Sequence, residues 1–165
     1  MSQVTMAVLG LVLGQVPAEE LPFHPEALRD RPRVEVRVRE AEADVVYAGV
    51  PLRSVLESRI EGPGRMPALR ALSDAVLLVR GADGYQAAVS AAAVAMDETG
   101  ERFLLARQRD GMPLGTGQGP IRLIVPGDRE RVRWVRNVSS IGLVRLKDVR
   151  PARSAAAVPG PPPDR

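Results

Sequence analysis

The clearest pattern of polar and apolar positions lies at Arg33–Arg39, which reads Arg-Val-Glu-Val-Arg-Val-Arg. Successive side chains of a strand point to opposite faces, so the three valines of this segment would share one buried face. We expect Val45–Tyr47 to form the return strand, with Glu40–Asp44 as the turn between them. The pattern therefore predicts a hairpin near the start of the domain.

A helical pattern follows. Pro51 suits the first position of a helix, because its missing N–H would be unpaired there anyway. Gly62-Pro63-Gly64 would end the helix. Spacings of three, one and four place four apolar residues on one helical face. These residues are Leu52, Val55, Leu56 and Ile60.

The rest of the chain alternates strand-length apolar runs with turn residues. The predicted strands are Asp74–Arg80, Tyr85–Val89, Phe103–Arg107, Ile121–Val125, Arg131–Val135 and about Val138–Leu146. Turns are expected at Gly81–Gly84 and Pro126–Asp128, because glycine and proline favour them. Ser90 is a candidate N-cap for a short helix that runs through Met96.

The two ends differ from the middle. The apolar segment Met6–Leu13 lacks the basic flank of a signal peptide and is too short to span a bilayer, so we predict a buried first strand. Pro17–Asp30 is expected to be a loop with a helical turn at Pro25–Leu28. From these elements we predict one α+β domain over residues 1–150, with a mixed, mainly-β core and a few short helices. The Pro/Ala-rich residues 151–165 are predicted to be a disordered tail.

Composition narrows the chemistry. The 165 residues include no cysteine, which excludes disulfides, zinc–thiolate sites, iron–sulfur clusters and thiol nucleophiles. The net charge is +3, and basic and acidic residues alternate rather than cluster, so we expect no nucleic-acid binding. We also expect no membrane association. His24 is the one histidine, and it has no partner at ligand spacing, which argues against a Ser-His-Asp hydrolase.

Several motifs in consistent order resemble one known family. These motifs are Gly49-Val50-Pro51-Leu52, Asp83-Gly84-Tyr85, Gly111-Met112-Pro113-Leu114, Gly119–Gly127 and Val132-Arg133-Trp134. Together they are similar to the oxidoreductase molybdopterin-binding domain, the catalytic domain of sulfite oxidases and assimilatory nitrate reductases. The resemblance covers about residues 8–146 and implies a sulfite-oxidase-like molybdopterin-binding fold. The compartment stays open: the missing signal features favour the cytoplasm, and the family analogy allows the periplasm.

The departures from the family concern its metal site. Active members ligate molybdenum through a cysteine between the alternating strand and the Gly-Val-Pro-Leu helix, and the matching interval, Arg39–Ala48, is short and has none. The family's histidine before Gly-Gly-Pro is also missing, and its place falls near Gly117. A thiolate is the soft donor that holds and tunes such a metal. The resemblance therefore implies a scaffold without the metal-binding residues.

The candidate binding residues follow from the same resemblance. The loop Gly115–Gly119 could present backbone N–H groups to a phosphate, and Arg122 and Arg133 could bind it in a bidentate manner. The predicted pterin-binding residues are Gly117, Gln118, Gly119, Arg122, Arg133 and Tyr85. The competing interpretation is a tight connection with two surface arginines. Trp134 is expected to be a core residue, because a lone aromatic in an apolar segment usually fills volume.

Three hypotheses remain open on the sequence. The domain could be a non-catalytic module that binds a pterin without molybdenum, another anionic small molecule or a protein partner. It could be a molybdenum oxidoreductase with a non-cysteine metal ligand. It could also be a structural or interaction domain with no ligand. The missing cysteine argues against the second hypothesis, and the sequence does not decide between the other two.

Overall fold

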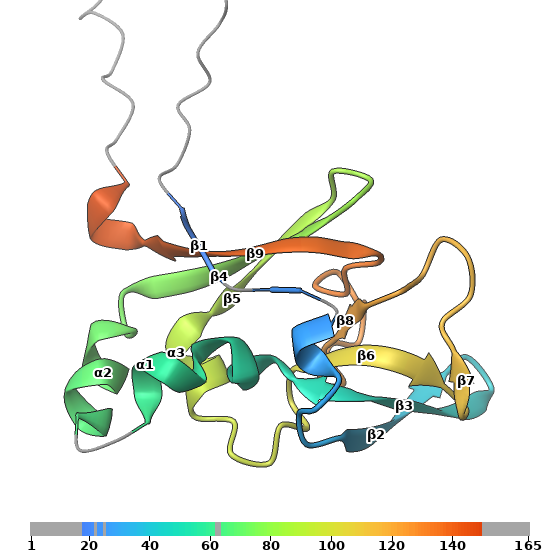
Figure 1. Cartoon of the computed structure of the whole chain (residues 1–165). Helices are drawn as coiled ribbons and strands as arrows, with labels where there is room; N and C mark the ends of the chain where they lie inside the picture. Colours follow the sequence, from blue (N-terminus) through green and yellow to red (C-terminus); the bar gives the residue numbers. More distant parts are fainter. Residues whose placement is uncertain (1–17, 22, 25, 62–63, 150–165) are drawn as a thin grey trace, which may run out of the picture.

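A computed structural model describes residues 18–21, 23–24, 26–61 and 64–149 of the chain. The predicted first strand at Met6–Leu13 and the predicted tail at residues 151–165 lie outside the described residues. In Figure 1 one sheet lies above the other, and the α-helices gather at one end of the pair. The large side chains between the sheets are fully buried and almost all aliphatic.

The upper sheet is antiparallel and has the strand order β1-β9-β4-β5. Its strands are β1 (Glu19–Glu20), β4 (Ala75–Gly81), β5 (Gln86–Ser90) and β9 (Val138–Arg145). Burial alternates along β4 and β5, as expected for strands that have one face on the core. The Asp83-Gly84 turn between them is confirmed, since Gly84 has a φ of 85° and the Asp83 carboxylate accepts from the Tyr85 N–H at 2.9 Å.

The lower sheet is built around a long hairpin. Its strands are β2 (Val34–Glu40), β3 (Ala43–Pro51), β6 (Leu104–Arg109), β7 (Met112–Pro113) and β8 (Arg122–Ile124). The order is β2-β3-β6-β7, and β8 also pairs with β6; all these pairs are antiparallel. Val36 and Val38 are buried, as the polar/apolar alternation of β2 predicts.

The helices are short. They are η1 (Glu26–Leu28), η2 (Leu52–Leu56), α1 (Glu57–Ile60), α2 (Arg65–Ala71), α3 (Ala91–Ala95) and η3 (Leu146–Asp148). The predicted cap of α3 is confirmed, because the Ser90 hydroxyl accepts from the Ala93 N–H at 3.3 Å. No helix in the described ranges is long and apolar enough to cross a membrane.

Two predicted elements need correction. The helix from Pro51 is a 3-10 segment, η2, followed by one turn of α-helix, although its four apolar residues are all buried as predicted. Arg131–Val135 is a turn and not a strand. Arg131 has a φ of 54° and its carbonyl accepts from the Trp134 N–H at 3.0 Å, so the backbone folds back despite its alternating pattern.

The structure also has elements that the sequence pattern did not predict. Helix α2 has no buried residue, so it lacks the apolar face that a periodicity argument needs. Strands β1 and β7 have two residues each and lie in segments that were expected to be loops. Elements this short carry too little pattern to be found from sequence.

Candidate functional site

Three of the segments that carry the family resemblance line one hollow of about 660 Å³. We call it the Arg107 hollow. Gly49 and Val50 come from β3, Pro113 and Leu114 from the β7 region, and Pro120 and Ile121 from the segment just before β8. Together they form a largely apolar wall. Sheet pairing brings these distant segments together, because β3 and β7 are both neighbours of β6.

Four arginines border the Arg107 hollow, and Glu26 is the one carboxylate residue among the described residues that line it. Three of these arginines have acidic partners: Arg29 with Glu26, Arg31 with Glu57, and Arg33 with Glu35. Arg107, on β6, forms no ion pair with any described residue. The hollow therefore combines positive charge with an apolar wall, which favours an organic anion.

The loop Gly115–Gly119 connects two residues of this hollow, Leu114 and Pro120. It is a tight turn in which the Gly115 carbonyl accepts from the N–H groups of Gln118 at 3.0 Å and Gly119 at 3.2 Å. Within the described part of the chain, the N–H groups of Thr116 and Gly117 have no partner. Gly117 has a φ of 80°, and there is open space where a side chain would begin. Part of the predicted phosphate-binding loop thus keeps free donors beside the hollow.

Arg122 lies behind this loop and is buried. Its Nη1 donates to the Gln118 Oε1 at 2.8 Å and to the Tyr47 hydroxyl at 3.3 Å, and its guanidinium carbon lies 5.2 Å from the Trp134 ring centroid. We call these four residues the Arg122 cluster. Cation–π contact and hydrogen bonds offset part of the cost of burying this charge. The Arg122 Nε is buried without a partner among the described residues.

The environment of the Arg122 cluster changes two protonation equilibria. Burial raises the pKa of the Tyr47 hydroxyl, and the hydrogen bond to Glu40 raises it further. Burial also lowers the pKa of Arg122. Arg122 nevertheless stays a cation near neutral pH, because a guanidinium holds its proton far above that range.

Replacing Tyr47 by Phe should reduce the free energy of unfolding by about 1–2 kcal/mol near pH 8, because Glu40 and Arg122 each lose a buried partner. The folded-state pKa of Tyr47 lies above the ordinary value of 10.0. The contribution of the Tyr47 hydroxyl to the free energy of unfolding is therefore complete below about pH 10 and is lost as the pH rises further. Urea unfolding at a series of pH values measures both effects. Tyr85→Phe is the control, since Tyr85 is 46% exposed and the loss of its hydroxyl should lower the free energy of unfolding less. If the difference in the free energy of unfolding between wild type and Tyr47→Phe stayed constant above pH 10, the expected dependence on the Tyr47 pKa would be wrong.

The interval that matches the family's metal-ligating segment, Arg39–Ala48, comprises the end of β2, a two-residue turn and most of β3. Glu40 pairs with Ala43, so only Ala41 and Glu42 separate β2 from β3. The Glu40 carboxylate already accepts from Tyr47 and from Arg109, each at 2.9 Å. Among the described residues, no group of three or more His, Cys, Asp or Glu is arranged to hold a metal ion. The chain also has no cysteine, and so lacks the soft thiolate donor with which the family holds molybdenum; its donor set does not suit that ion.

Arg133 and Tyr85 line no part of the Arg107 hollow. Arg133 forms an ion pair with Asp128, and each residue shifts the pKa of the other, upward for Arg133 and downward for Asp128. The Tyr85 hydroxyl donates to the Val132 carbonyl. Arg122 lines no part of the Arg107 hollow either, and a shared binding site for Arg122 and Arg133 stays a prediction. Aromatic and amide contacts hold Arg122 inside the core instead.

The sequence interpretation missed the arginines of the Arg107 hollow. Arg31 and Arg33 flank Pro32 just before β2, and Arg107 ends the apolar run Phe103–Ala106. The sequence signal that could have identified Arg107 is a charged residue directly after a buried apolar run within a strand. Trp134 is confirmed as a core residue, since it is 5% exposed and its Nε1 donates to the Val125 carbonyl at 2.8 Å.

The protein is thus an α+β domain, and its arginine-bordered hollow has the charge and the apolar wall that suit an organic anion. The model of the oxidoreductase molybdopterin binding domain matches residues 25–148, and the chain belongs to that family. A comparison with curated proteins finds no match. The match covers all the strands described above except β1, so it includes both hairpins and every segment that lines the Arg107 hollow.

Proposed function

We propose that this domain is a non-catalytic member of its family that binds the phosphate-bearing pterin, or an anion of similar shape, in the Arg107 hollow. One observation carries the proposal. The hollow is lined by residues of three motifs that resemble the family, and four arginines border it. A ligand with a flat ring and a charged end suits this combination of an apolar wall and guanidinium groups.

Each part of the hollow has a separate role in the proposed binding. Arg107 donates charge-assisted hydrogen bonds to the anionic group, and it is available because it forms no ion pair with a described residue. Val50, Leu114 and Pro120 pack against the ring. The free N–H groups of Thr116 and Gly117 supply donors for a second polar group of the ligand. Arg122 holds the loop from behind through its bond to Gln118.

The missing thiolate supports the non-catalytic part of the proposal. When bound, the family cofactor supplies a metal that changes oxidation state, while the protein holds and orients it. This chain has no cysteine, and the interval that would carry the ligand is a tight hairpin with a two-residue turn. Recognition of the organic anion uses arginines, backbone amides and apolar contacts, so it does not depend on that thiolate.

The test is the pterin content of the full-length protein after expression in a host that makes molybdenum cofactor. The wild-type protein should release a fluorescent pterin on denaturation. Arg107→Gln should bind it at least about tenfold more weakly, because one charge-assisted hydrogen bond contributes about 1.5–3 kcal/mol. Arg102→Gln is the matched control, since Arg102 lies outside this hollow and should keep the pterin. Wild-type protein without pterin, or an Arg107→Gln variant that retains it fully, would contradict the proposal.

A further inference from the structure

Strand β2 has a neighbour on one side only. It is seven residues long and lies at the end of the lower sheet, where β3 is its single partner among the described strands. A strand with an open side presents unpaired backbone groups, to which a further strand can bind. The proposed function makes no use of this strand, since no residue of β2 lines the Arg107 hollow.

The hydrogen bonds of β3 show which backbone groups of β2 point to the open side. The Val46 N–H donates to the Asp110 carboxylate at 2.9 Å, and the Val46 carbonyl accepts from the Asp110 N–H at 2.7 Å. Asp110 follows β6, so both groups of Val46 point away from β2. Arg37 lies opposite Val46, and opposite residues of an antiparallel pair exchange both bonds or neither. The N–H and C=O of Arg37 therefore point outward, and by alternation so do those of Glu35 and Arg39.

The open part of this side ends at Arg39. The outward carbonyl of Arg39 accepts from the Arg131 Nη2 at 3.1 Å, which agrees with the assigned direction. Among the described residues, the outward N–H and C=O groups of Glu35 and Arg37 have no hydrogen-bond partner. We call the backbone groups of these two residues the β2 edge.

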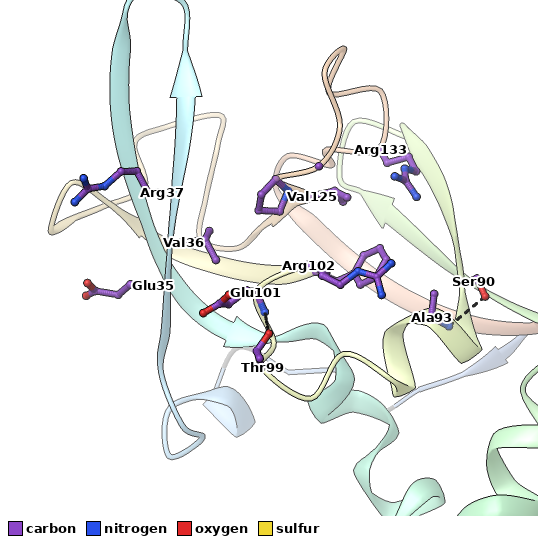
Figure 2. A pocket seen from close by; sticks show the side chains of 13 residues that line it. Glu35, Val36, Arg37, Ser90, Ala93, Thr99, Glu101, Arg102, Val125 and Arg133 are labelled. Carbon is purple, nitrogen blue, oxygen red and sulfur yellow. Dashed lines mark hydrogen bonds between the residues drawn. The ribbon is translucent and has the colours of Figure 1, made fainter.

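The side chains along the β2 edge form one charged and one apolar face. Figure 2 shows Glu35 and Arg37 on one side of the strand and Val36 on the other. Glu35 and Arg37 are exposed, and Arg37 forms no ion pair with any described residue. Val36 lines a hollow of about 720 Å³ along this edge, together with the buried residues Phe103 and Val125. The hollow leaves room for apolar side chains of a strand that is added at the edge.

From this geometry we infer that the β2 edge joins two copies of this chain into a symmetric dimer with a continuous lower sheet. In an antiparallel arrangement centred on Val36, Glu35 lies opposite Arg37 of the partner subunit, and the two-fold axis repeats this pair. Each of the two pairs exchanges both backbone hydrogen bonds and places opposite charges across the strands. On the apolar face, Val36 lies opposite Val36 of the partner subunit.

Charge and hydrogen bonding select this register over its neighbours. A pairing centred on Arg37 would place two arginines opposite each other, and it would need the Arg39 carbonyl, which is already bound. A pairing centred on Glu35 would place two glutamates opposite each other. Like charges directly opposite are destabilising. In the selected register Arg33 faces Arg39 of the partner subunit beyond the edge, but each already has an acidic partner in its own chain.

The test is sedimentation velocity of the full-length protein over a range of concentrations. The wild type should form dimers with a dissociation constant on the order of 10–100 μM, because one pair of strands gives a small interface. Arg37→Glu should weaken the dimer at least about tenfold, since two attractive pairs become repulsive, and Glu35→Arg should do the same. Arg70→Glu is the matched control. It makes the same change of charge at an exposed position of α2 and should dimerise like wild type.

Mixing the two variants tests the register itself. Arg37→Glu has two acidic residues at the β2 edge, and Glu35→Arg has two basic ones, so the two chains complement each other. An equimolar mixture should form a heterodimer about as tight as the wild-type dimer, although each variant alone associates at least about tenfold more weakly. The double variant Glu35→Arg/Arg37→Glu should regain the homodimer, because the opposite charges face each other again.

Amide hydrogen exchange gives a second measurement on the wild-type protein. The N–H groups of Glu35 and Arg37 should exchange more slowly as the protein concentration rises, because the dimer protects them. Exchange at these groups that is fast at every concentration would overturn the proposal. Slow exchange that does not change with concentration would assign the β2 edge to a segment of the same chain and would also overturn it.

The sedimentation results can overturn the dimer independently. A wild type that stays monomeric throughout the concentration range would leave the β2 edge to a strand of another protein. Association of Arg37→Glu as strong as that of wild type, or a mixture of the two variants that forms no heterodimer, would place the contact elsewhere on the surface. Each of these outcomes contradicts the proposal. Pterin binding in the Arg107 hollow can fail without any change in these results.

Discussion

Protein loaded with molybdenum cofactor should not oxidise sulfite at a rate that follows its molybdenum content. The metal must be held by the protein in a defined geometry to cycle between oxidation states. This chain offers no thiolate, and the β2–β3 turn contains only Ala41 and Glu42. Glu40, which precedes this turn, is already bound to Tyr47 and Arg109, and the carboxylate of Glu42 is a hard oxygen donor and no substitute for a soft thiolate. We therefore expect the loss of essentially all metal-centred turnover.

An assay of steady-state sulfite oxidation with an artificial electron acceptor measures the rate of metal-centred turnover. Molybdenum and pterin contents are determined on the same preparations, so that a failure to load is distinguished from a failure to turn over. Protein that contains pterin and remains inactive agrees with the proposed function. Turnover in proportion to molybdenum would instead indicate an oxygen or nitrogen ligand in this chain, and it would support the alternative of a molybdenum oxidoreductase.

Replacing Leu56 by Ala should reduce the free energy of unfolding by about 2–5 kcal/mol, the usual cost of a large cavity in a core. Leu56 is 0% exposed and ends η2, where Leu52 and Val55 are also buried. Urea unfolding monitored by circular dichroism measures the loss. Ser58→Ala is the matched control on the next helix, α1, because Ser58 is exposed and its replacement should change the free energy of unfolding by less than about 0.5 kcal/mol. A loss of that small size for Leu56→Ala would place its side chain on the surface.

These predictions depend to different degrees on sequence and on structure. The alternation in Arg33–Arg39 and the spacing of Leu52 to Ile60 predicted which side chains are buried, because burial of one face imposes a period that can be read in the chain. The same reasoning failed at Arg131–Val135, where two positive φ angles, at Arg131 and Asn137, fold the backbone into a turn. Local pattern does not reveal such a bend.

By itself, the sequence determined the α+β class, the family resemblance and the absence of a thiolate, since these depend on local patterns and on composition. Only the tertiary structure decided which arginines border a hollow. Sheet pairing places Arg107 beside the loop Gly115–Gly119, while Trp134, Tyr47 and Gln118 hold Arg122 in the core. An arginine in a strand has the same sequence signature in a hollow as in a core. Its environment is set by residues far away in the chain, which only the folded sheets bring into contact.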